Sequence, residues 1–221
     1  MGGSAQSIWD KIALLSLLDQ TNKFGQIEGN LKLQKLVFLS ELGGLEEPLV
    51  PMYFRFFRYA LGPYSAELAN EIKGLESGAF ITSTSRRLTQ RGHYILEYAA
   101  DAIQNSQEAR RAMEIIRDVA KRYGRRSGDE LKAFVYKLKV PVYDLGGTTF
   151  RVKDVPHFLD ILNPRHMKGA DEVRLLDEQL IQDLTEEFAL SPRDLAATST
   201  SHRQIVSSEF RRIIQEHRPT S

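Results

Sequence analysis

The turn Leu61-Gly62-Pro63-Tyr64-Ser65 constrains the fold more strongly than any other part of the chain. It follows an aromatic-rich stretch, residues 53–59, whose composition is typical of a β-strand. Gly62 and Pro63 favour a turn, and Ser65 can accept hydrogen bonds from the first backbone N–H groups of a helix. A strand is therefore expected to end at this turn, and a helix is expected to begin at Ser65.

Apolar residues at helical spacing predict that most of the chain is helical. The Phe24-Gly25 and Gly43-Gly44 pairs end the first two helices, and Thr89 is expected to cap another. The predicted helices cover residues 8–19, 33–40, 65–77, 89–102, 107–123, 127–138, 171–189 and 202–217. The second is so rich in apolar residues that it is expected to be buried on most sides, as the core helix.

A small β component accompanies these helices. Besides the strand at 53–59, residues 81–88 are β-branched and hydroxyl-rich, which predicts a short strand pair. Helix, turn, helix, strand pair, helix is the order of a winged helix-turn-helix. The fold class expected is mainly α with a small β component, a winged-helix-like helical core with an appended C-terminal helical segment. Gly146-Gly147 begins the most linker-like stretch, so we divide the chain into a helical domain, 1–145, and a C-terminal extension, 146–221.

Composition excludes several classes of protein. With 221 residues, 42% hydrophobic and 27% charged, the chain can fill one core and a smaller appended unit. It has no cysteine, which excludes disulfides, Cys-ligated metals and thiol nucleophiles. A net charge of +1 gives no global preference for nucleic acid, so electrostatic arguments must be local. Neither a secretion signal nor a membrane span is recognisable, and a cytoplasmic location without membrane association is expected.

Catalytic motifs are missing from the sequence. It contains no Gly-x-Ser-x-Gly elbow, Walker loop or Gly-x-Gly-x-x-Gly pattern. The five histidines are scattered without metal-ligand spacing. We therefore expect no enzyme activity, no catalytic residue, no metal site and no cofactor.

A basic stretch, Lys121-Arg122-Tyr123-Gly124-Arg125-Arg126, is the strongest local electrostatic signal. Its cations and its aromatic ring could contact phosphates and stack on bases. The alternative is a solvated helix end, because cations near a C-terminus favour the helix dipole and glycine commonly follows the last turn. The acidic helix at 171–189 could cover this stretch or mimic a partner surface.

The order of four motifs in residues 30–100 resembles the Panacea domain, also called the SocA-like antitoxin domain, and its YwgA-type relatives. The motifs are Leu33-Gln34-Lys35-Leu36, Gly62-Pro63-Tyr64-Ser65, Leu75-x-x-Gly78-x-x-Ile81 and Leu88-Thr89-x-x-Gly92. The resemblance implies a mostly helical domain that acts by binding proteins. Members are paired as antitoxins with varied toxins, and SocA-type members are protease adaptors.

The preferred hypothesis is a non-enzymatic protein-binding module of antitoxin or protease-adaptor type. Its partner would be a protein, such as a cognate toxin or a protease. The partner-binding surface is expected at Tyr59, Gly62, Pro63, Tyr64 and Ser65. Tyr64 is the candidate anchor, because aromatic residues are enriched at interface hot spots, although a Tyr64 packed inward is equally expected.

The alternative is a winged-helix DNA-binding transcriptional regulator. Helix 65–77 would be its recognition helix, Arg86 and Arg87 would lie in the wing, and Lys121, Arg122, Arg125 and Arg126 would contact phosphates. Helix 65–77 itself disfavours this hypothesis. It carries three glutamates and a single lysine, Lys73, which is a poor surface to place in a groove lined by phosphates.

Overall fold

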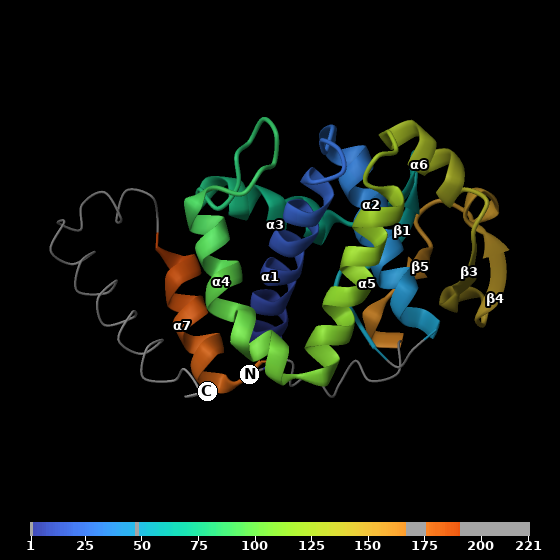
Figure 1. Ribbon diagram of the computed structural model, residues 1–221. Helices are drawn as coiled ribbons and strands as arrows, with labels where there is room; N and C mark the ends of the chain where they lie inside the picture. The colour runs from blue at the N-terminus through green and yellow to red at the C-terminus, as the bar shows by residue number, and fades with distance from the viewer. Residues whose placement is uncertain (1, 47–48, 167–175, 191–221) are drawn as a thin grey trace, which may run out of the picture.

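The computed structural model describes residues 2–46, 49–166 and 176–190, and this part of the chain is mainly α-helical with a small β component (Figure 1). The helices are α1 (Gly2–Asn22), α2 (Gly29–Gly43), α3 (Ala66–Ser77), α4 (Gln90–Asn105), α5 (Gln107–Tyr123), α6 (Gly128–Val135) and α7 (Glu178–Ala189). The strands are β1 (Phe56–Tyr59), β2 (Gly62–Tyr64), β3 (Lys139–Val142), β4 (Thr148–Arg151) and β5 (Asp160–Leu162). Short 3₁₀ turns lie at Gly44–Glu46, Tyr143–Leu145, Val152–Asp154 and Pro164–His166. The expectation of a mainly α class with a small β component is confirmed.

Two helices form the centre of the core. α1 packs against α4, α5 and α7, and in the view of Figure 1 it lies behind α4 and α5. α2 packs against α5 and α6, and every residue from Lys32 to Glu41 is buried. The prediction of a core helix buried on most sides is therefore correct, but this helix also buries Lys32, Gln34, Lys35 and Glu41. Buried polar groups of this kind need partners in the fold.

Local capping signals define the helix starts, at Ser65 and Thr89 as predicted and also at Ser127. The Ser65 hydroxyl accepts a hydrogen bond from Leu68 N, and the Thr89 hydroxyl accepts one from Gly92 N. Ser127 and Glu130 form a capping box at the start of α6. Each of these bonds satisfies a backbone donor that the helix itself leaves free.

The strands form two small antiparallel sheets. One has the order β2-β1-β5 and pairs Phe57 with both Tyr64 and Asp160. The other is the hairpin β3–β4, with Gly146 and Gly147 in its turn. β3 packs beside β5, so the hairpin adjoins the first sheet.

Some expectations about strands were wrong. Residues 81–88 form a loop closed by a single bridge, Ile81 to Leu88, instead of a strand pair, so no two-stranded wing follows α3. The stretch interpreted as linker contains the β3–β4 hairpin and β5. The boundary placed at residue 145 falls in the hairpin turn, and β5, beyond it, pairs with β1, before it. The helix predicted at 202–217 and the first residues of the one at 171–189 lie outside the described residues.

Candidate protein-binding surface

Two of the sequence motifs are joined by hydrogen bonds. Gln34 Nε2 donates to Ser65 O at 2.9 Å, and Ser65 N donates to Gln34 Oε1 at 2.8 Å. Beside them, Lys35 Nζ donates to Pro63 O at 2.7 Å. The turn at 61–65 is therefore held to the core helix by three buried hydrogen bonds, which fix the position of the strand before it and the helix after it.

The turn itself is mostly structural. Gly62 has a φ of 96°, and a Cβ at this position would lie 2.9 Å from Cε1 of Tyr136, so glycine is required on both counts. Gly62, Pro63 and Ser65 are all buried. Of the five residues predicted to bind a partner, only Tyr59 and Tyr64 present side chains to the outside.

Lys35 is an unusual base within this arrangement. Burial of its ammonium group lowers its pKa to about 7, and the charges of Arg58 and Lys132 act in the same direction. Its side chain is 2% exposed, and Pro63 O accepts its hydrogen bond. Lys35 therefore acts as an internal support of the turn, with no access to a substrate.

Four aromatic rings gather on the outer face of the β2-β1-β5 sheet, and we call them the aromatic patch: Phe57, Tyr59, Tyr64 and Phe158. Alternation along β1 places Phe56 and Arg58 in the interior, whereas Phe57 and Tyr59 face outward. The centroid of Phe57 lies 5.6 Å from that of Tyr64, 6.1 Å from Tyr59 and 6.4 Å from Phe158. The centroid of Tyr59 lies 5.7 Å from that of Tyr64 and 5.8 Å from Phe158. The rings form one continuous surface.

Two rings of the aromatic patch and a neighbouring leucine are well exposed to solvent. Phe158 is 69% exposed, Tyr59 is 46% exposed and the adjacent Leu61 is 51% exposed. Phe158 also has a φ of 69°, an unfavourable backbone conformation for a bulky residue. Exposed aromatic side chains that are held in place by their neighbours are typical of protein-binding hot spots. Strained backbone is often concentrated at functional positions.

Polar contacts surround and position the patch. Arg55 Nε donates a bifurcated hydrogen bond to both oxygens of the Asp160 carboxylate, at 2.9 and 2.8 Å, so an ion pair lies at one end of the sheet. Phe158 N donates to Arg58 O at 2.7 Å, which attaches the exposed ring to β1.

Side chains from three helices clamp the segment that leads into β1. Trp9 Nε1 donates to Pro51 O, while Asp10, Glu41 and Glu67 accept hydrogen bonds from the backbone N–H groups of residues 53, 54 and 55 respectively. Burial raises the pKa of both the Asp10 and the Glu41 carboxyl groups, although the backbone hydrogen bonds oppose this rise. The second oxygen of Glu41 is buried without a hydrogen-bond partner among the described residues. Asp10 and Glu41 position this segment from the inside, whereas the exposed Glu67 holds it from the surface.

Sequence reasoning missed Phe57 and Phe158. Phe57 could have been found, because it lies two residues from Tyr59 in the same strand and therefore faces the same side of the sheet. Phe158 had no local signal, since it joins the patch only through the pairing of β5 with β1, about a hundred residues earlier in the chain.

The predicted nucleic-acid contacts divide into exposed and buried groups. Arg86 is buried. Its guanidinium donates to Gly29 O and to Asn30 Oδ1 and lies near Glu76. The prediction that Arg86 lies in an exposed wing is therefore wrong. Arg126 is half-buried and stacks over Tyr123 and Phe134. The exposed members are Arg87, Lys121, Arg122 and Arg125.

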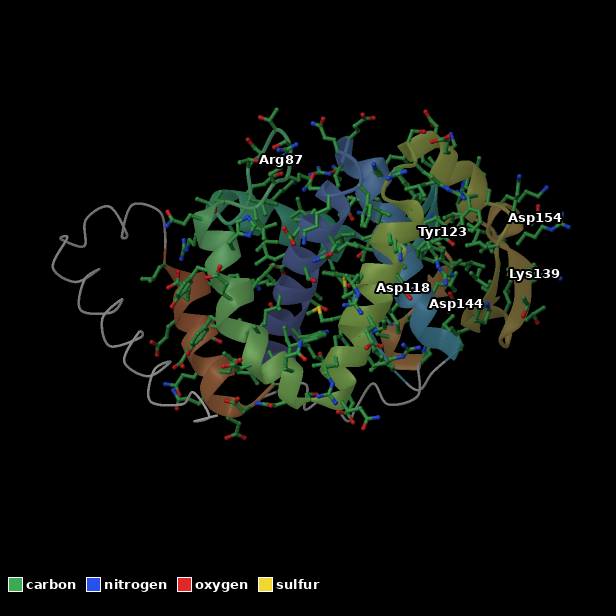
Figure 2. All side chains as sticks on the ribbon, in the orientation of Figure 1. Arg87, Asp118, Tyr123, Lys139, Asp144 and Asp154 are labelled. Atoms are coloured by element: carbon green, nitrogen blue, oxygen red, sulfur yellow. The ribbon has the colours of Figure 1, made fainter. Side chains whose placement is uncertain are left out.

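The end of α1 and the start of α2 contact both basic segments, which therefore lie at one end of the molecule. Asn22 Nδ2 donates to Arg86 O at 3.2 Å, and Lys32 Nζ donates to both Gln26 O and Gly124 O at 2.7 Å. Figure 2 shows the Arg87 loop toward the same end as the last turn of α5, near Tyr123. The acidic α7 packs instead on α1 and α4, and its Glu187 pairs with Arg91 at 2.9 Å.

Comparisons of the chain with protein-family models, curated proteins and solved structures found no match. Within the described ranges, no three His, Cys, Asp or Glu side chains are grouped so that they could hold a metal ion. None of the helices in that part of the chain has the length and apolar character needed to cross a bilayer.

Proposed function

We propose that this protein is a non-enzymatic, cytoplasmic protein-binding module of antitoxin or protease-adaptor type, and that it binds its partner through the aromatic patch. The observation that carries the proposal is the continuous outward cluster of Phe57, Tyr59, Tyr64 and Phe158, with Phe158 69% exposed. Large exposed apolar surfaces on soluble domains commonly mark interaction sites. The order of the Panacea-type motifs also supports the proposal, because the family acts by binding proteins.

Affinity capture tests this proposal. The tagged full chain is used to capture proteins from its native lysate with nuclease added, alongside the variant Tyr59→Ala and the control Leu145→Ala. Leu145 is 41% exposed and lies in the β3–β4 hairpin turn, so it matches Tyr59 in exposure but not in location. A stoichiometric partner such as a toxin or protease is expected with the wild type and the control, and its loss is expected with Tyr59→Ala. Equal capture by all three would contradict the assigned surface.

DNA binding remains the second candidate, because one observation favours it. Arg87 and the exposed residues of the 121–126 stretch flank the same α1–α2 loop, so cations separated in sequence lie at one end of the fold. The negative charge of α3, which disfavours DNA binding, is partly neutralised, since Glu71 pairs with Lys11 and Glu76 pairs with Arg86. The test is the salt dependence of duplex binding, compared between the wild type and Arg87→Ala/Arg125→Ala. A shallower slope in the variant supports phosphate contacts at this end, and identical slopes would count against them.

A further inference from the structure

Strand β4 has a free backbone edge within the part of the chain that the structure describes. In an antiparallel pair, every second residue exchanges hydrogen bonds with the residue opposite it. Val152 N donates to Leu138 O, in register with β3–β4, so Val152 and Phe150 direct their backbone groups toward β3. The N–H and C=O groups of Thr149 and Arg151 therefore point away from β3. Among the described residues, no hydrogen bond engages these four groups.

The position of Pro141 agrees with this assignment. Pro141 lies opposite Thr149 and has no N–H, so it fits a position whose N–H does not join the ladder. Thr149 and Arg151 are both exposed. In Figure 1, β4 lies at the margin of the molecule, on the outer side of β3.

The edges of the other sheet are closed. In β2, Pro63 faces away from β1, because its partner Arg58 exchanges backbone bonds with residues 158 and 159. Pro63 has no N–H, and its carbonyl accepts the bond from Lys35. On the opposite side, Asp160 N of β5 donates to Asp144 Oδ2 at 3.1 Å, and β3 packs beside β5. Folded proteins commonly protect their sheet edges in such ways, so the free edge of β4 is an exception within this fold.

Uncompensated cations lie along this free edge. Lys139 lies directly opposite Arg151, and both side chains are exposed on the same face of the hairpin. Like charges in this arrangement destabilise a sheet. Lys153 adds a third exposed cation, and none of the three has an ion-pair partner in the described ranges, the adjacent Asp154 included. Figure 2 shows Lys139 far from Arg87, so these cations are separate from the basic end of the molecule.

The opposite face of the hairpin is apolar. Val140 and Val142 are buried there, and Phe150 is only half-buried. A strand added beside β4 would therefore place one side chain next to Phe150 and the side chains before and after it on the cationic face.

We propose that β4 binds an extended acidic segment of a partner protein as an additional antiparallel strand, with the pattern acid–apolar–acid. The backbone of the segment would exchange hydrogen bonds with Thr149 and Arg151. Its two acids would lie opposite these residues, at about 5 Å between Cβ atoms, and the apolar residue would cover Phe150. Strand addition to a sheet edge is a recurrent mode of recognition, and complementary charges select the partner. The interface uses none of the residues of the aromatic patch.

A second copy of the chain fits this edge less well. It would present the same cations, so the pairing of two β4 edges would bring arginine and lysine side chains next to one another. An acidic strand instead offsets the repulsion between Lys139 and Arg151.

Selection from a display library of ten-residue linear peptides, with the full chain as the target, tests the proposal. We expect the enriched sequences to share the pattern acid–apolar–acid. Their affinities are then measured by fluorescence polarisation for the wild type, for Thr149→Pro and for the matched control Thr149→Val. Proline removes the outward N–H and is tolerated on the free side of an edge strand, whereas valine keeps the N–H. Circular dichroism verifies folding.

The expected loss of affinity is about tenfold or more with Thr149→Pro and less than about twofold with Thr149→Val, because only proline leaves a peptide carbonyl unpaired. Arg151→Glu should lose about five- to tenfold, and a peptide with lysine opposite residue 151 should regain this loss. The control Arg125→Glu, an exposed cation at the basic end, should lose less than about twofold.

Modified peptides test the same bonds without altering the protein. N-methylation of the two acids blocks the N–H groups that face β4 and should abolish binding, whereas N-methylation of the apolar residue between them should preserve it. Equal effects of these modifications, equal affinities of Thr149→Pro and Thr149→Val, or no enrichment of the pattern would overturn the proposal. Binding lost with Arg125→Glu or Tyr59→Ala, but kept with Thr149→Pro, would overturn it by placing the peptides elsewhere. A wild-type dimer that Thr149→Pro dissociates would overturn it in favour of a second copy.

Discussion

Gln34 and Ser65 exchange two hydrogen bonds across the core, from Gln34 Nε2 to Ser65 O and from Ser65 N to Gln34 Oε1. The Gln34 side-chain amide thus satisfies both the N–H and the C=O of Ser65, as the backbone of a neighbouring β-strand would. Ser65 is fully buried and Gln34 is 4% exposed, so water cannot replace either bond. The pair connects the core helix to the first residue before α3.

We expect Gln34→Ala to lower the free energy of unfolding by about 2–4 kcal/mol, because it leaves a buried donor and a buried acceptor unpaired. Urea denaturation followed by circular dichroism measures this loss. The control, Gln90→Ala, changes an exposed glutamine and should stay within about 0.5 kcal/mol of the wild type. If Gln34→Ala is no less stable than this control, the two bonds do not hold the turn.

The contrast between α3 and Phe158 shows what could be predicted from the sequence. The ends of α3 depend on neighbouring residues, a serine cap and a following glycine, and the predicted bounds, 65–77, agree with the observed helix. The β3–β4 hairpin was missed because Gly146 and Gly147 were interpreted as the start of a linker, whereas the structure uses these glycines to form the turn. The aromatic patch was predicted in part, through Tyr59 and Tyr64, because its other half depends on long-range pairing that no local pattern reports.

Lys35 should make stability depend on pH above neutrality. Its pKa is about 7 in the fold, because of burial and the nearby Arg58, whereas an unfolded lysine titrates near 10.4. Between these values the unfolded chain binds one proton more than the folded chain, so this residue makes stability rise with pH by up to about 1.4 kcal/mol per unit. Lys35→Met should remove that rise, whereas Lys73→Met, at an exposed position, should keep it. Urea unfolding from pH 7 to pH 9.5 gives the comparison. Parallel curves for the wild type and Lys35→Met would show that the amine is not titrating in this range.

Glu41 should have the opposite effect at lower pH. Burial and the neighbouring Asp10 raise the pKa of its carboxyl group, so the folded chain keeps a proton that the unfolded chain loses above about pH 4.3. Its contribution to stability is therefore greatest at low pH and falls as pH rises toward the folded pKa. Glu41→Gln keeps an acceptor for Phe54 N without a charge. We expect it to flatten the pH dependence and to raise stability near pH 8 relative to the wild type. The control is Glu97→Gln, at an exposed position. A Glu41→Gln profile that falls with pH as steeply as the wild type would assign the effect to other groups.

Substitutions at Phe158 should affect stability and partner binding differently. Its φ of 69° is unfavourable for phenylalanine and costs glycine little. Both Phe158→Gly and Phe158→Ala delete the ring and its contacts with Phe57 and Tyr59, but only glycine relieves the backbone. We therefore expect Phe158→Gly to be more stable than Phe158→Ala by about 1 kcal/mol in thermal or urea unfolding. Both variants should nevertheless lose the captured partner, because the most exposed ring of the aromatic patch is gone. Equal stabilities would show that the position carries no strain. Undiminished capture by either variant would place the binding surface elsewhere on the molecule.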